Sequence, residues 1–121
     1  PGRALLADLA DAFGHEEAGQ RLAAARDLVR GMVRGGQAAA CDYAEPQRRE
    51  TALRFVLDAF NGKADSILAR VKHDNAGKLS QEVRDAAALV NLNGRAFRNA
   101  RVTEAYVDAR VEEVRWAAVV H

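Results

Sequence analysis

The chain has 121 residues, 49% of them hydrophobic, and a formal net charge of +1. This length predicts a single domain that can bury a core without disulfides or metals. Its single cysteine, Cys41, excludes an internal disulfide and fits a reducing compartment. No apolar run approaches the roughly 18 residues that predict a membrane-spanning helix.

The charge is unevenly distributed along the chain. Residues 48–101 hold 11 basic and 6 acidic residues, whereas the segments before and after them are both net acidic. An excess of positive charge in the middle of the chain suits an anionic partner.

Helical periodicity predicts two elements in the N-terminal third. Apolar residues three or four apart predict helices over residues 3–13 and 16–33. We expect Gly14 to end the first helix and a glycine pair to end the second, because glycine readily adopts the backbone conformation past a helix end. Residues 37–47 then form a connector.

The third predicted helix, residues 47–73, carries the longest apolar stripe in the chain. Gly62 lies inside it and should cost about 1 kcal/mol relative to alanine, unless another backbone passes close to it. A polar turn leads to a fourth helix over residues 78–99, and Thr103 is expected to cap a last helix. The sequence therefore predicts an all-α fold, a helical bundle of four to five helices with two long antiparallel central helices.

The apolar stripes of these two long helices supply the predicted core. We expect burial of Leu57, Phe60, Ile67, Leu68, Val83, Val90 and Phe97.

No catalytic or metal-binding motif is present in the sequence. Neither the dinucleotide-binding motif G-x-G-x-x-G nor a Walker phosphate-binding loop occurs in the sequence. The three histidines lie at no metal-ligand spacing from one another or from Cys41. That cysteine also has no histidine nearby to activate it as a nucleophile. We therefore expect no enzyme activity, no metal site and no cofactor.

Two polar runs supply most of the candidate binding residues. The run Lys72 to Asn75 is either an acid–base cluster or, more simply, a helix cap and a turn. The run from Asn91 to Arg101 either presents arginines to carboxylates or phosphates, or forms a hydrogen-bonded network that fixes helix packing. The candidate binding residues are Asn61, Lys63, Arg70, Lys72, His73, Asn75, Lys78, Asn91, Asn93, Arg95, Arg98, Asn99 and Arg101.

Three motifs between Cys41 and Trp116 are distinctive in combination. They are FNGKAD at 60–65, KHDN at 72–75 and NGRAFRNAR at 93–101. In this segment the chain resembles a bacterial helical domain found in SNIPE-type phage-defence proteins. In such proteins the domain typically follows a coiled coil or a membrane anchor and precedes a GIY-YIG nuclease domain.

The resemblance implies a non-catalytic recognition or regulatory domain of an anti-phage nuclease. Cleavage would belong to a separate GIY-YIG domain, and the whole protein would lie in the cytoplasm or at the inner face of the bacterial inner membrane. Residues 1–121 would form one helical domain of a larger protein. Residues 1–40 would be N-terminal helices at the end of an upstream coiled coil, and residues 41–121 the family-like core.

Several partners are compatible with these observations. We favour a protein partner, from phage or host or the protein's own nuclease domain, over a DNA backbone. The positive charge is modest, and no row of aromatic residues offers bases a stacking platform. The alternative is a structural module that forms a homo-oligomer or supports a coiled coil. Basic side chains on one exposed face would favour binding, whereas ion pairs with nearby aspartates would favour structure.

Overall fold

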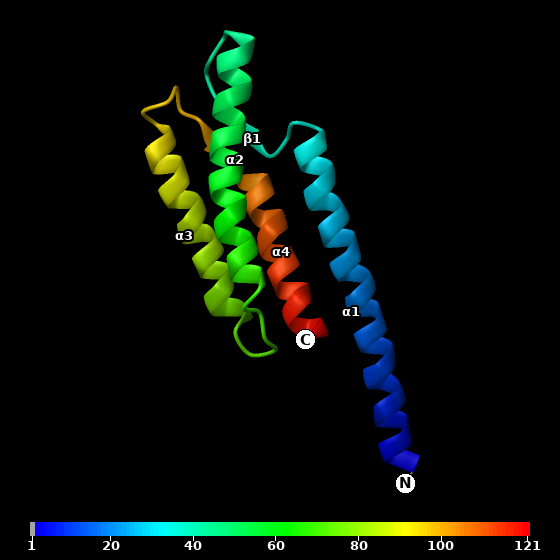
Figure 1. Ribbon diagram of the computed structural model, residues 1–121. Coiled ribbons are helices and arrows are strands. Elements are labelled where there is room, and N and C mark those ends of the chain that lie inside the picture. The colour runs from blue at the N-terminus through cyan, green and yellow to red at the C-terminus, as the bar shows by residue number, and fades with distance from the viewer. Residues whose placement is uncertain (1) are drawn as a thin grey trace.

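The computed structural model describes the backbone of residues 2–121 and the side chains of residues 14–121. Over these residues the chain forms four helices and two strands of two residues each (Figure 1). They are α1 (Gly2–Arg34), β1 (Ala39–Ala40), α2 (Pro46–Leu68), α3 (Ala76–Gly94), β2 (Arg101–Val102) and α4 (Glu104–Val120). The predicted all-α class is confirmed, with the small strand pair as an addition.

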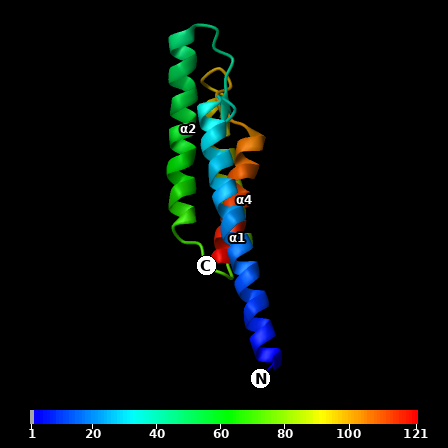
Figure 2. The ribbon, with the colours of Figure 1, turned by 90° about the vertical axis from the view of Figure 1, so that its right-hand side faces the viewer.

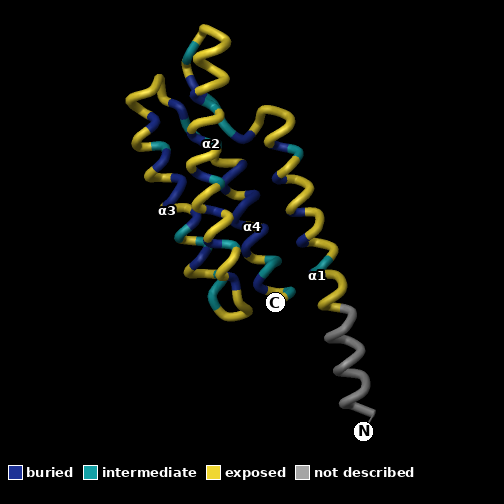
Figure 3. The backbone as a smooth tube through the Cα atoms, in the orientation of Figure 1, coloured by how far each residue is buried: buried dark blue, intermediate teal, exposed yellow. Residues whose placement is uncertain are grey.

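The helices pack as a bundle around one core. A short turn joins α2 to α3, which run antiparallel and side by side, as predicted (Figure 1). Helix α4 packs against α3, and α1 lies along α4 (Figure 2). Along residues 14–121, buried and exposed residues alternate within each helix, as expected where one face packs against neighbouring helices (Figure 3).

Helix α1 differs from the prediction at Gly14. The helix continues through this residue instead of ending there, so residues 3–13 and 16–33 belong to one element. A glycine ends a helix only when the chain turns into the left-handed region, and Gly36 does this with a φ of 74°. The predicted apolar face of residues 3–13 lies outside the described side chains.

The turn between α2 and α3 is wider than predicted. Helix α2 ends at Leu68, and α3 begins at Ala76. The Asn75 side chain accepts a hydrogen bond from the Lys72 amide at 2.8 Å and donates one to the Arg70 carbonyl at 2.9 Å. These bonds satisfy backbone groups that a continuing helix would have paired, so Asn75 shapes the turn.

The strand pair was not predicted, because two residues are too few for a periodic signal. Ala39 pairs with Val102 and Ala40 with Arg101, antiparallel. The Asn91 side-chain amide accepts from the Val102 amide at 2.9 Å and donates to its carbonyl at 3.2 Å. This pair of bonds ties the edge of the ladder to α3.

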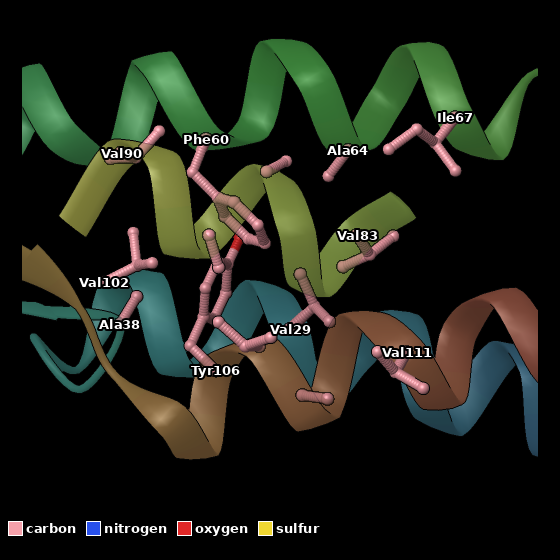
Figure 4. Close-up of a cluster of buried hydrophobic side chains, with 14 of the residues drawn as sticks. Val29, Ala38, Phe60, Ala64, Ile67, Val83, Val90, Val102, Tyr106 and Val111 are labelled. Atoms are coloured by element: carbon pink, nitrogen blue, oxygen red, sulfur yellow. The ribbon is translucent and has the colours of Figure 1, made fainter. Parts of the chain in front are cut away.

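An edge-to-face pair of Phe60 and Tyr106, with ring centroids 5.9 Å apart, lies at the centre of the core (Figure 4). The Tyr106 hydroxyl donates to Asn61 Oδ1 at 2.8 Å, so its polar end is also satisfied. Among the predicted core residues, Phe97 is wrong, since it is 51% exposed. The others are buried or pack against the core: Leu57, Phe60, Ile67, Leu68, Val83 and Val90.

Gly94 has a close backbone contact that Gly62 lacks. A Cβ at Gly94 would lie 1.7 Å from the Ala100 carbonyl oxygen, whereas a Cβ at Gly62 would meet nothing within 4 Å. The loop after α3 therefore requires glycine at position 94. Gly62 needs no such freedom and only weakens its helix.

We expect opposite effects from the two alanine substitutions. Gly94→Ala should lower the free energy of unfolding by about 2–3 kcal/mol, because the new methyl group forces the loop apart. Gly62→Ala should raise it by about 1 kcal/mol, because alanine favours an exposed helix. Urea unfolding followed by circular dichroism measures both. A Gly94→Ala protein as stable as wild type would contradict the close approach.

Two charged side chains of α4 are buried. Arg110 donates a hydrogen bond to Asp65 of α2 at 2.5 Å, and its Nε lies 3.8 Å from a carboxylate oxygen of Glu113. Burial raises the pKa of the Glu113 carboxyl, and the neighbouring Arg110 only partly opposes this. The neutral form of Glu113 is therefore favoured more in the folded protein than in the unfolded chain.

The raised pKa of Glu113 makes the free energy of unfolding depend on pH. Stability gained from protonated Glu113 is lost as pH rises through its folded-state pKa. We expect Glu113→Gln to be more stable than wild type at neutral pH, and this advantage to shrink on acidification towards the ordinary glutamate range. Thermal unfolding across pH measures it. The exposed neighbour Glu112, paired with Arg115 at 3.0 Å, provides the control Glu112→Gln, which should show no such trend.

Candidate binding site

A pocket of about 540 Å³ lies at the end of the bundle where α2 begins and α3 ends. Three aromatic side chains and two alanines give it a largely apolar surface, and polar residues of α2 complete it. The lining residues are Tyr43, Glu45, Gln47, Arg48, Thr51, Ala52, Phe55, Phe97 and Ala100.

Phe55 and Phe97 form an aromatic pair on the open side of this pocket. Their ring centroids lie 6.1 Å apart at an interplanar angle of 53°. They remain 63% and 51% exposed, although burial of a phenylalanine is strongly favourable. Exposed aromatic side chains that adjoin a concave apolar surface are typical of a binding site.

The loop that follows α3 explains why Phe97 is exposed. The Gly94 carbonyl accepts hydrogen bonds from the amides of Phe97, at 2.9 Å, and of Ala100, at 3.0 Å. The helix has already ended, so the helical spacing that predicted a buried Phe97 no longer applies. The same ending removes the helical face that Asn91, Arg95 and Arg98 were expected to share.

The loop also holds two residues in the left-handed region. Arg98 has a φ of 51° and Asn99 a φ of 54°. Asparagine tolerates this conformation, but for arginine it costs about 1–2 kcal/mol. The Arg98 carbonyl accepts a hydrogen bond from the Asp42 amide at 2.8 Å, which holds the loop against the segment before α2. Backbone strain of this kind is concentrated at functional sites.

The carboxylates near the pocket are already engaged. Glu45 caps α2 by accepting from the Gln47 and Arg48 amides at 3.1 and 2.7 Å. Glu50 pairs with Arg54 at 2.9 Å, and Asp42 lies 3.7 Å from Arg101.

Three arginines at this end of the bundle have no carboxylate partner in the described part of the chain: Arg48, which lines the pocket, and Arg95 and Arg98, which lie on either side of Phe97 in the chain. Among residues 14–121, Arg48, Arg95 and Arg98 have no carboxylate within ion-pair distance. The surface around the aromatic pair therefore carries uncompensated positive charge.

The candidate residues of the sequence do not converge on one face. Arg95, Arg98, Asn99 and Arg101 lie near the pocket, whereas Lys63, Lys72, His73 and Lys78 lie towards the opposite end of the bundle. The 19 residues of α3, about 28 Å of helix, lie between His73 and Arg95. The exposed candidates are Lys63, Arg70, Lys72, His73, Lys78, Asn93, Arg95, Arg98 and Asn99.

Four candidates instead hold the fold together. Asn61, Asn75 and Asn91 make the core and backbone hydrogen bonds given above. Arg70 binds Glu82 of α3 at 2.6 Å, and this hydrogen bond lowers the pKa of the Glu82 carboxyl. Within the two polar runs, Asn75 agrees with the turn interpretation and Asn91 with the interpretation of a network that fixes helix packing.

Most of the aromatic pocket was not predicted from the sequence. The predicted binding residues include neither Tyr43 nor Phe55 nor Arg48, and Phe97 was predicted to lie in the core. Phe55 carried a usable signal, because it lies off the apolar stripe that Val56 and Phe60 continue. A large aromatic residue off the buried stripe of a helix indicates an exposed ring.

Two negative findings apply to the part of the chain that the structure describes. There, no three histidine, cysteine or acidic side chains gather as metal ligands would. Likewise, none of the four helices combines the length and the apolar character of a membrane span.

The family model of the SNIPE associated domain matches residues 15–121. No curated protein and no solved structure matches the chain. The matched region contains the whole pocket and its surrounding arginines.

Arg95 and Arg98 form a matched pair for testing the strain. Arg98→Gly should raise the free energy of unfolding by up to about 1 kcal/mol, because glycine adopts a positive φ without cost. Arg95 has right-handed helical angles, so Arg95→Gly should lower it by about 0.5–1 kcal/mol. Chemical unfolding of both variants measures the difference. Equal losses in the two proteins would show that Arg98 is not strained.

Proposed function

Since the chain belongs to the SNIPE associated domain family, we propose that it is a non-catalytic recognition module of a phage-defence nuclease. It binds a protein partner through the pocket lined by Tyr43, Phe55 and Phe97. Binding positions the nuclease, a GIY-YIG domain in the whole protein, at its target. The chemistry of cleavage belongs to that other domain.

The exposed Phe55–Phe97 pair is the observation that carries this proposal. Protein interfaces depend on a few large aromatic or arginine side chains near a desolvated centre, surrounded by polar groups. The pocket has this composition, with aromatic rings at its opening and arginines around it. A domain with only a structural role would have no need to leave two phenylalanines exposed.

DNA is the weaker candidate. The exposed aromatic pair removes the objection that no ring is available to stack on bases. The two rings are tilted against each other, however, and do not form a row along which successive bases could stack. The candidate basic residues form two groups towards opposite ends of the bundle, and Arg84 between them pairs with Asp108 at 3.0 Å, so they do not form one continuous track for a phosphate backbone.

The proposal can be tested in the full-length protein during phage infection. A photo-crosslinking phenylalanine analogue at position 55 or 97 should form crosslinks to a protein. The same analogue at Leu89, which is 48% exposed on α3, should form none or far fewer. Phe55→Ser and Phe97→Ser should reduce protection against phage, with protein abundance and melting temperature unchanged. Leu89→Ser is the matched control and should protect normally.

Two results would count against this function. Full protection by the Phe55→Ser and Phe97→Ser double variant would exclude the pocket as the recognition site. Metal-dependent DNA cleavage by the purified domain, lost on a point substitution within it, would show that the domain is itself catalytic.

A further inference from the structure

We infer that the pocket takes an acidic polypeptide segment that inserts a bulky apolar side chain beside Phe55 and Phe97 and places its carboxylates against Arg48, Arg95 and Arg98. This inference rests on the proposed function and adds the chemical class of the partner. It joins Arg95 and Arg98 of the predicted polar run to Arg48, Phe55 and Phe97, which were not among the candidate residues.

The inner surface of the pocket fits an apolar anchor. Ala52 and Ala100 are buried and contribute only methyl groups, while the aromatic rings of Tyr43, Phe55 and Phe97 complete the surface. The volume of about 540 Å³ falls within the range of ordinary ligand pockets and leaves room for a large side chain. Removal of the two exposed rings from water is the main gain on binding.

The charge around the pocket selects for an acidic partner. Residues 41–55 and 94–101 hold six arginines but only three carboxylates. All three carboxylates are used within the chain, by the helix cap and by the pairs with Arg54 and Arg101. Of the remaining four arginines, Arg49 donates a hydrogen bond to the Cys41 carbonyl at 3.5 Å. Arg48, Arg95 and Arg98 therefore remain available to carboxylates of a partner, which guanidinium groups bind in a fixed geometry.

The fixed backbone of the 95–100 loop also favours binding of an acidic partner. Arg98 is held in a strained conformation, and Phe97 lies directly before it in the same loop. The backbone positions from which the Phe97 ring and the Arg98 side chain project are thus fixed relative to each other before any partner binds. Such preorganisation reduces the ordering cost of binding.

A polypeptide fits this surface better than a nucleic acid. Glu45 lines the pocket, and its carboxylate is fixed on the first amides of α2, where it would repel a phosphate. A peptide can place its carboxylates on the arginine side and its apolar side chain against the rings. A phosphodiester chain carries charge at every step, so it has less freedom than a peptide to keep its charges away from Glu45.

The test uses short fluorescein-labelled peptides of equal length and measures their binding by fluorescence anisotropy. One peptide has a central tryptophan flanked by glutamates, the second replaces the glutamates with glutamines, and the third replaces the tryptophan with serine. An oligothymidylate of similar length is the nucleic-acid probe. The protein variants are Phe97→Ser, the Arg95→Gln/Arg98→Gln pair, and the far-end pair Lys63→Gln/Lys72→Gln as the control for charge.

We expect the acidic tryptophan peptide to bind about tenfold more tightly than the glutamine peptide at low salt. The arginine pair of substitutions should remove most of that preference, whereas the lysine pair should leave it unchanged. Phe97→Ser should weaken both tryptophan peptides, and the serine peptide should bind least. High salt should reduce the preference for the acidic peptide.

The failures of the two proposals are distinguishable. Equal binding of the acidic and glutamine peptides, with both weakened by Phe97→Ser, would overturn the acidic class but leave the pocket as a protein-binding site. Stronger binding of oligothymidylate through Phe97 would overturn both. Absence of peptide binding, together with normal phage protection by the Phe97→Ser full-length protein, would also overturn both.

Discussion

The contact between the Gly94 backbone and the Ala100 carbonyl is the constraint on which the end of the bundle depends. It allows α3 to stop and the chain to fold back within a few residues. The return places Val102 where Asn91 can bind both of its backbone groups, and Thr103 where it caps α4. It also leaves Phe97 on the outside beside Phe55. The absence of a side chain at Gly94 therefore determines both how the end of the bundle packs and where the aromatic surface forms.

The periodic parts of the structure could be predicted from the sequence, because burial of one helix face recurs every three or four residues. Phe60, Val83 and Val90 follow that pattern and lie in the core. Gly14 shows where local reasoning fails, since glycine permits a helix end without requiring one. The conformation of the 95–100 loop depends on the Asp42 amide, more than fifty residues earlier in the chain. No local pattern contains that contact.

The candidate site also has a part that local sequence patterns predict and a part that depends on contacts between distant residues. Sequence reasoning found the arginines of the NGRAFRNAR motif, because guanidinium groups bind carboxylates or phosphates and because several asparagines are unusual in a helix. It could not separate Asn91, which binds backbone, from Arg95 and Arg98, which face solvent, because that difference arises only where α3 ends. The aromatic pair joins α2 to the loop, and residues 55 and 97 become neighbours only in the folded chain.

The order of the helices along the chain also affects which parts of the bundle form first during folding. Helices α2 and α3 are neighbours in sequence, so their contacts close a short loop at little entropic cost. The contacts of α1 with α4, and the Thr103 hydroxyl bond to the Gln37 carbonyl at 2.8 Å, join residues more than sixty positions apart. High contact order slows the formation of such contacts. During synthesis, α2 and α3 would therefore pack against each other early, and α1 would dock only after α4 had been synthesised.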